Sequence, residues 1–181
     1  ETEWAKNGRH TGRTDIPLTD LGRAQAVAVG RKIGKQAFAE VLSSPLARAL
    51  DTSRIAGFGG RVELVDDLRE WDYGADEGRT TEEIRRERPG WSIWGDGPKD
   101  GERIDDVSAR ADRIIERVLA ASGDVLCFAH GHVLRILAAR WLDLDPVEGR
   151  RFALSTATLS VLGWEREIAD VQRWNEACVG V

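Results

Sequence analysis

One stretch constrains the fold of this chain more than any other, because an apolar run there passes through a His-Gly turn into a helical pattern. The run at 125–128 reads Val-Leu-Cys-Phe and is apolar on both faces, as expected for a strand inside a parallel sheet covered by helices. His130 and Gly131 follow at the carboxyl end of this strand. In open α/β sheets, ligands bind at that edge. The helix N-terminus beside it favours an anion such as phosphate.

Helical and extended patterns alternate along the rest of the chain. Helices are predicted from Thr19-Asp20 to about Ile33, from Ser44-Pro45 to Gly57, over 80–88, from Asp105 to Val118 and from 132 onward, and strands over 40–42, 62–65, 124–128, 158–164 and 168–174. The segment 89–103, rich in Gly, Pro and Trp, is predicted to be a long surface excursion. This alternation predicts a three-layer α/β/α sandwich with a mostly parallel central sheet, and one domain over 1–181.

The composition limits the classes of binding partner that we expect. The 181 residues suffice for one domain with a substantial core, and the net charge of −5 argues against nucleic acid or an anionic membrane. Apolar stretches are too short to span a bilayer, and no signal-peptide pattern opens the chain. Cys127 and Cys178 lack a C-x-x-C spacing, which favours reduced thiols and a cytoplasmic location. A surface rich in Trp would allow a homodimer.

Three polar groups follow three of the predicted strands. Arg48 falls in a first helical turn after the strand at 40–42, Glu70 follows the strand at 62–65, and His130 follows the third. Arg suits phosphate, because its planar fork donates parallel hydrogen bonds. Each residue alone has an ordinary interpretation as a solvated arginine, a surface carboxylate or a core histidine. Together they favour a site for phosphate esters.

The spacing His130-x-His132 also raises the possibility of zinc, since alternate histidines can bind it. The chain has only one other histidine, His10, and no Cys pair. A metal would need carboxylates that no recognisable motif supplies. We therefore predict no metal and no cofactor.

Five stretches, in this order, resemble the histidine phosphatase superfamily, also called the phosphoglycerate mutase-like family. They are Glu1-Thr2-Glu3-Trp4, Gly8 to Thr19, Ser43 to Ala49, Leu68-Arg69-Glu70 with Tyr73-Gly74 and Glu77-Gly78, and Ala129-His130-Gly131-His132. They cover nearly the whole chain, and their combination is highly specific.

The resemblance implies phosphoryl transfer through a phosphohistidine, which splits one displacement into two. Glu70 would protonate the leaving oxygen and then activate water, and His130 would hold developing charge on the phosphoryl oxygens. The other implied site residues bind phosphate (Arg48, Thr11, Gly12 and Gly131) or line the substrate pocket (Arg9, Tyr73, Trp94 and His132). The partner would be a small-molecule phosphate ester.

The family's nucleophile lies in an Arg-His-Gly triplet that directly precedes Glu-Thr-x-Trp. Neither this triplet nor the strand before it occurs in the 181 residues, which start at Glu1. We expect about ten preceding residues that form an apolar strand ending in Arg-His-Gly. The alternative is a non-catalytic module that binds a phospho-ligand. The run Arg9-His10-Thr11-Gly12 resembles the triplet with an insertion, but no strand precedes it, so we interpret it as a substrate loop.

Two departures bear on the substrate. Ala5 stands where the mutases usually carry Asn, and the excursion around Trp91 and Trp94 is shorter than their insertion. These features look most like sugar-bisphosphatases and broad-specificity acid phosphatases, which favours hydrolysis of phosphosugars; a phosphoglycerate mutase is the alternative. Trp91 and Trp94 could stack on a sugar face or simply pack their loop against the domain.

Overall fold

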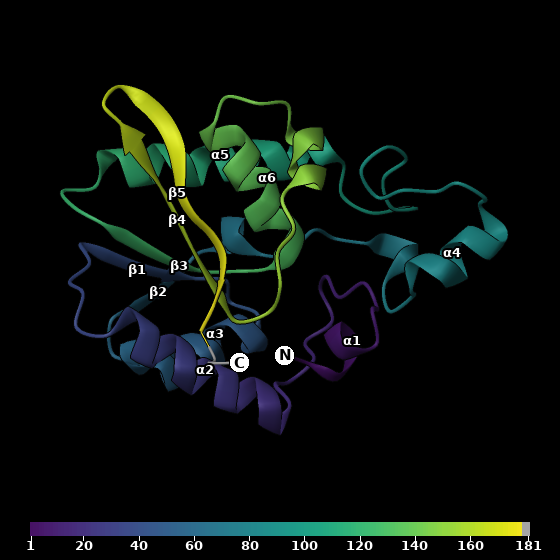
Figure 1. Ribbon diagram of the computed structural model, residues 1–181. Coiled ribbons are helices and arrows are strands. Elements are labelled where there is room, and N and C mark those ends of the chain that lie inside the picture. The colour runs from purple at the N-terminus through teal and green to yellow at the C-terminus, as the bar shows by residue number, and fades with distance from the viewer. Residues whose placement is uncertain (179–181) are drawn as a thin grey trace.

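A computed structural model describes residues 1–178, and its centre is a parallel sheet covered by helices on both faces. The sheet has the order β2-β1-β3, formed by β1 (Glu40–Ser43), β2 (Val62–Leu64) and β3 (Val125–Phe128). In Figure 1, α2 (Asp20–Ile33) and α3 (Ala47–Ser53) lie on one side of the sheet, and α5 (Ile104–Ala120) and α6 (Gly131–Trp141) lie on the other. The predicted α/β/α layering is confirmed.

A separate antiparallel pair of strands completes the fold. It consists of β4 (Thr158–Glu165) and β5 (Ile168–Ala177), with an irregular register around Val161. Both strands were predicted, and each extends beyond the last residue of its predicted range. The remaining elements are α1 (Glu3–Lys6), α4 (Thr81–Glu87), η1 (Arg54–Phe58), η2 (Asp66–Leu68), η3 (Gly74–Asp76) and η4 (Pro146–Arg151).

Local sequence accounts for the helix ends. Thr19 caps α2 by accepting the amide N–H of Gly22, and Gly34 ends the helix with a φ of 65°. Thr80 and Glu83 form the predicted capping box of α4. No helix within 1–178 has the length and apolar character needed to cross a membrane.

The helix predicted to start at Ser44-Pro45 instead starts at Ala47, so that prediction is wrong. The Ser44 amide donates to the Phe128 carbonyl at 2.9 Å, which extends the pairing of the β1 chain with β3 beyond the strand end. Leu46 is still extended, with φ −66° and ψ 131°. Sheet pairing therefore delays the helix, and Arg48 remains in its first turn.

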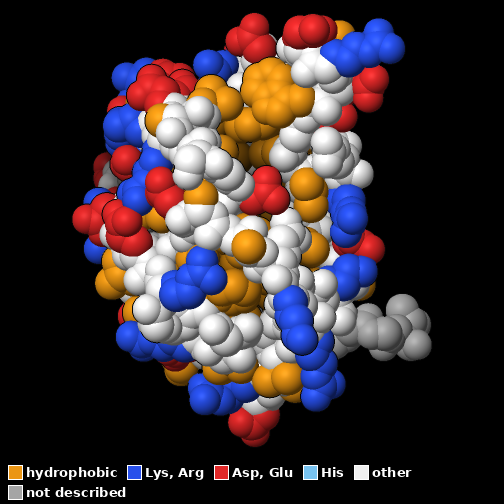
Figure 2. All heavy atoms as spheres, turned by 90° about the vertical axis from the view of Figure 1, so that its left-hand side faces the viewer, with side chains coloured by type: hydrophobic (Ala, Val, Ile, Leu, Met, Phe, Trp, Pro, Cys, Tyr) orange, Lys and Arg blue, Asp and Glu red, His pale blue; other side chains and the backbone are white. Residues whose placement is uncertain are grey.

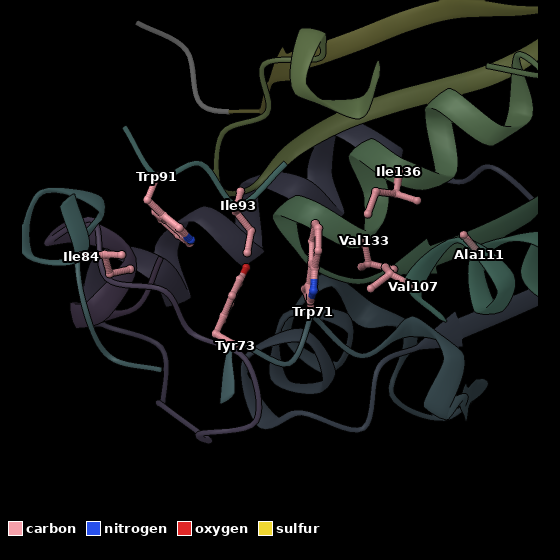
Figure 3. Packing of buried hydrophobic residues seen from close by; sticks show 9 residues of the cluster. All are labelled: Trp71, Tyr73, Ile84, Trp91, Ile93, Val107, Ala111, Val133 and Ile136. Atoms are coloured by element: carbon pink, nitrogen blue, oxygen red, sulfur yellow. The ribbon is translucent and has the colours of Figure 1, made fainter. Parts of the chain in front are cut away.

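The excursion at 89–103 is not simply a surface segment, which corrects the prediction. Trp91 and Ile93 are only 3% and 6% exposed and belong to a core cluster with Trp71 and Tyr73 (Figure 3). The buried Asp76 carboxylate accepts the amide of Lys99 at 2.8 Å and anchors the excursion. The segment therefore forms one wall of the region where the site residues meet.

A cavity of about 1360 Å³ runs between the two sheets. It is lined by β3 on one side and β4 on the other, and by side chains of α2 and α5 from the two helical layers. Among the described strands, β3 pairs only with β1, and β4 pairs only with β5. Figure 2 views the molecule from the left-hand side of Figure 1 and shows apolar side chains in hollows between charged ones of both signs.

Candidate active site

The structure brings Arg48, Glu70 and His130 together at the carboxyl edge of the parallel sheet, as their positions after three strands predict. All three line the large cavity. His130 is the N-cap residue of α6, with an extended backbone, and Gly131 begins the helix. The amides of the first turn of α6 therefore point toward this edge, where an anion would be stabilised.

His130 is held in one orientation by two partners. Arg48 Nε donates to His130 Nδ1 at 3.1 Å, and His130 Nε2 lies 2.8 Å from the Ser44 hydroxyl. Burial, reinforced by the Arg48 charge, lowers the pKa of His130 to about 3. The ring is therefore neutral near pH 7, with Nδ1 accepting from Arg48 and the proton on Nε2.

Arg48 links His130 to the loop that contains Thr11, Gly12 and Thr14. Its Nη1 donates to the Thr14 carbonyl at 3.1 Å, and its Nη2 donates to the carbonyls of Thr11 and Gly12 at 2.9 and 3.0 Å. Burial lowers the pKa of Arg48, while the Glu70 charge opposes that shift. Since an arginine stays protonated in proteins, the site contains a fixed positive charge.

Glu77 organises the same loop and was not among the predicted site residues. Its carboxylate accepts the amides of Gly12, at 2.9 and 3.0 Å, and of Thr14, at 3.0 Å. A Cβ at Gly12 would lie 2.6 Å from the Trp71 carbonyl oxygen, so only glycine allows this approach. The Gly12 amide is thus already bonded, and Thr11 and Gly12 act on the site through the carbonyls that orient Arg48.

Glu70 is buried and accepts three backbone hydrogen bonds. Its Oε1 accepts the amides of Trp71 and Val133 at 2.9 and 3.0 Å, and its Oε2 accepts the amide of His132 at 3.0 Å. Burial alone would raise the pKa of Glu70, but the backbone N–H groups favour the ionised carboxylate, and the pKa lies below its ordinary value. The carboxylate is therefore ionised before an anion enters.

Aromatic rings form a wall beside Glu70. The Tyr73 hydroxyl lies 2.7 Å from His132 Nδ1, and burial raises the pKa of this phenol well above its ordinary value, so the phenol donates. Burial lowers the pKa of His132 to about 4, so the imidazole is neutral near pH 7. Trp94 lies 5.2 Å from the His132 ring, measured between centroids. The guanidinium of Arg135 stacks over Trp94 at 4.6 Å.

His10 contributes its ring to this wall, and the interpretation of its loop as substrate-loop backbone did not anticipate that. The ring lies edge-on to Tyr73 at 4.9 Å and to Trp91 at 5.5 Å, while Nδ1 lies 2.8 Å from the Arg79 carbonyl. Arg9 is engaged by Glu83 at 3.2 Å and by a backbone carbonyl, so its guanidinium braces the loop.

Within 1–178, no group of three or more His, Cys, Asp or Glu side chains is placed to hold a metal ion. His130 and His132 use ring nitrogens for Arg48, Ser44 and Tyr73. The His132 and Val133 amides at the start of α6 are bonded to Glu70, so the arrangement can bind an anion between the fixed guanidinium of Arg48 and the Gly131 amide, and can transfer a proton through Glu70.

Similar proteins share this arrangement of elements. The chain is 41% identical to an acid phosphatase of Mycobacterium tuberculosis, over 93% of this chain and 84% of the relative. It is 34% identical to sedoheptulose 1,7-bisphosphatase of Saccharomyces cerevisiae, over 80% of this chain and 65% of the relative. A solved Mycobacterium tuberculosis protein superposes with a TM-score of 0.92 at 38% identity, covering 99% of this chain and 94% of that one.

A mycobacterial glucosyl-3-phosphoglycerate phosphatase, solved in complex with VO3, superposes with a TM-score of 0.87 at 28% identity, covering 97% of this chain and 94% of that one. The family model of the histidine phosphatase superfamily, branch 1, matches residues 1–177. This chain therefore belongs to branch 1 of the histidine phosphatase superfamily.

Proposed function

We propose that this protein hydrolyses small phosphomonoesters, phosphosugars above all, through a phosphohistidine and without a metal. The observation that carries the proposal is the Arg48–His130 hydrogen bond of 3.1 Å beside the buried Glu70 carboxylate. A fixed cation and the Gly131 amide at the N-terminus of α6 meet the charge of a phosphoryl group. A carboxylate at the same edge serves proton transfer.

The reaction has two displacements. A histidine nitrogen attacks phosphorus, the bond from phosphorus to the ester oxygen breaks, and protonated Glu70 gives its proton to that oxygen. Water then attacks the phosphohistidine, the P–N bond breaks, and Glu70 takes a proton from the water. Phosphate leaves, and both the histidine and Glu70 return to their starting states.

The nucleophile is the part of this mechanism that the three histidines of the sequence do not supply. His130 uses both ring nitrogens, for Arg48 and Ser44. His132 Nδ1 is engaged by Tyr73 at 2.7 Å and His10 Nδ1 lies 2.8 Å from a carbonyl oxygen, which leaves Nε2 on each ring, but both rings pack in the aromatic wall and neither bonds to Arg48. We propose that the nucleophile belongs to a strand that precedes Glu1 in the single catalytic domain.

The large cavity supports this part of the proposal. Glu1 lines the cavity together with β3 and β4, whose facing edges lack a partner among the described strands. Adjacent strands in a sheet lie about 4.7–4.9 Å apart, and unpaired backbone groups in a buried sheet are costly. A strand inserted there would pair with β3 and direct its carboxyl end toward His130.

The aromatic wall supports a sugar as the leaving group. Neutral His132 and the half-buried ring of Trp94 offer apolar faces and a few hydrogen bonds, which suits a hydroxylated ring. The names of the relatives, acid phosphatase and sedoheptulose 1,7-bisphosphatase, agree with this choice.

We further propose a cytoplasmic location and a homodimer. The molecular mass measured by light scattering tests the homodimer.

The test uses the protein with the residues that precede Glu1. Phosphate release is measured over a panel of sugar phosphates, and the phosphoenzyme is quenched in alkali and mapped by mass spectrometry. We expect release of phosphate and a phosphohistidine preceding Glu1. Phosphate on His10, His130 or His132 would contradict the strand proposal alone. Conversion of 3-phosphoglycerate to 2-phosphoglycerate without phosphate release would indicate a mutase. Phosphate binding with no turnover of any ester would indicate a non-catalytic module.

A further inference from the structure

An ion pair lies beside the segment that carries Glu70, and the mechanism above does not use it. Arg110 Nε donates to Glu102 Oε1 at 2.7 Å, and Arg110 Nη2 donates to Glu102 Oε2 at 3.0 Å. The Arg110 side chain is 9% exposed and the Glu102 side chain is 20% exposed. A paired guanidinium and carboxylate with this geometry make strong, directional hydrogen bonds.

Arg110 also holds the chain on the amino side of Glu70. Its Nη1 donates to the carbonyl of Asp67 at 2.8 Å and to the carbonyl of Arg69. Arg69 is the residue directly before Glu70. One guanidinium on α5 therefore fixes the backbone that leads into the proton-transferring residue.

Glu102 holds the chain on the carboxyl side. Its carbonyl accepts the Trp71 indole N–H at 2.7 Å, and its carboxylate accepts the Asp72 amide at 3.3 Å. Its own amide donates to the Asp72 carbonyl at 2.9 Å. Arg110 and Glu102 therefore hold the backbone on both sides of Glu70.

Residues 69–73 lie between η2 and η3 and belong to no helix or strand. The backbone of this segment therefore depends on these side-chain contacts to keep its position. Beside this segment is a small cavity of about 140 Å³, lined by Glu70, Glu102 and Arg110 among others. Without the pair, the segment would have room to retreat from the first turn of α6. Fixing it in advance avoids an ordering cost during the reaction.

We propose that Glu102 and Arg110 form a clamp that positions Glu70 for proton transfer, as positioning residues that touch neither substrate nor nucleophile. The inference rests on the proposed function, because it assigns Glu70 a proton to deliver. A misplaced Glu70 harms the reaction only where the leaving oxygen needs that proton. The clamp therefore matters most for alkyl phosphates, whose leaving groups are poor.

The experiment compares Arg110→Gln and Glu102→Gln on an alkyl phosphate and on p-nitrophenyl phosphate, using the full-length protein. We expect kcat on the alkyl phosphate to fall by about tenfold to a hundredfold, as for a catalytic group displaced by about 1 Å. We expect a much smaller fall on p-nitrophenyl phosphate and a similar KM on both. Adding either change to Glu70→Gln should cost the alkyl substrate little more, because the group that the clamp positions is already gone.

Arg113→Gln is the matched control. Arg113 lies on the same helix and pairs with the Asp67 side chain at 2.6 Å, but it donates no hydrogen bond to a carbonyl of the Glu70 segment. We expect it to change neither substrate's kcat. If Arg110→Gln does not fold, Glu102→Gln decides, since it keeps the backbone carbonyl that binds Trp71.

Equal losses on both substrates, or full additivity with Glu70→Gln, would overturn the clamp. Failure of the proposed function looks different. In that case the unsubstituted protein releases no phosphate, or Glu70→Gln itself affects both substrates equally.

Discussion

The carboxylate of Glu70 accepts the backbone N–H of Val133 at 3.0 Å, which ties the proton-transferring group to the first turn of α6. Amides favour the ionised carboxylate against the effect of burial, and the pKa of Glu70 is lowered. A general acid must nevertheless be protonated. The proton therefore has to arrive with the substrate, either on the phosphate itself or because the phosphate charge raises the pKa of Glu70.

The first prediction concerns the pH dependence of the rate. We expect kcat/KM on an alkyl phosphate to fall as pH rises above about 6, where a phosphate monoester loses its second proton. Above that pH neither the ester nor Glu70 brings the proton that the leaving oxygen needs. Steady-state rates between pH 4.5 and 8.5 measure this, and a flat profile across the range would refute it.

The second prediction concerns Glu70 itself. Glu70→Gln removes the proton donor while leaving an oxygen for the amides, so we expect a loss of about a hundredfold or more on an alkyl phosphate. The loss should be smaller on p-nitrophenyl phosphate, because its leaving group departs without a proton. The ratio of the two losses is the readout. A ratio near one would assign Glu70 a positioning or structural role.

The third prediction is a loss of stability in acid. The pKa values of His130 and His132 are about 3 and about 4 in the folded protein, and the ordinary value is 6.5. Below pH 6.5 these two histidines become protonated in the unfolded chain but stay neutral in the folded protein. Folding stability therefore decreases as pH falls from 6.5 toward 4. Each histidine contributes a slope of up to about 1.4 kcal/mol per pH unit.

Urea midpoints at pH 7 and pH 5 check this prediction, with His132→Asn as the comparison. The variant should lose stability at pH 7, because Asn leaves space where the imidazole ring packs against Trp71, Tyr73 and Trp94, and its stability should depend less on pH. An unchanged pH dependence in the variant would show that His132 is not held neutral in the folded state.

The alternation of strands and helices predicted much of this site. His130, Arg48 and Glu70 each follow a parallel strand, and such strand ends necessarily meet at one edge of the sheet. The strand–turn–helix pattern around His130 needs only local sequence. Those three positions could therefore be assigned before any coordinates.

Features that depend on distant contacts could not be predicted in this way. The late start of α3 results from the bond between the Ser44 amide and the Phe128 carbonyl, which are 84 positions apart (128 − 44). The burial of Trp91 follows from its packing in the cluster that includes Tyr73; the sequence left packing of this loop against the domain as one of two alternatives and could not choose between them. Glu77 lay in a recognised motif, but its bond to the Gly12 amide needs the folded loop.

The fourth prediction concerns metal. Because Arg48 and the Gly131 amide at the N-terminus of α6 would meet the phosphate charge, we expect full activity in the presence of a strong chelator. Phosphate release from a sugar phosphate, assayed with and without EDTA after dialysis, is the measurement. Loss of activity that zinc or magnesium restores would contradict the phosphohistidine mechanism proposed here.

The fifth prediction tests the link from Glu77 to Arg48. Glu77→Ala leaves the amides of Gly12 and Thr14 without their carboxylate, and hydrogen bonds to a charged group contribute about 1.5–3 kcal/mol each. The loop whose carbonyls orient Arg48 should then loosen, and phosphate binding should weaken. We expect the Ki of inorganic phosphate to rise by about tenfold or more, which corresponds to about 1.4 kcal/mol.

Glu77→Gln is the matched control, because its amide oxygen can take the place of Oε1 and accept both N–H groups without the negative charge, and the size of the side chain is kept. It should lie between the parent and Glu77→Ala in phosphate affinity. Glu82→Ala controls for the loss of a carboxylate as such, since Glu82 pairs with Arg86 on the exposed face of α4. An unchanged phosphate affinity in Glu77→Ala would mean that Arg48 keeps its place without the loop, and that the contacts to Thr11 and Gly12 do not orient it.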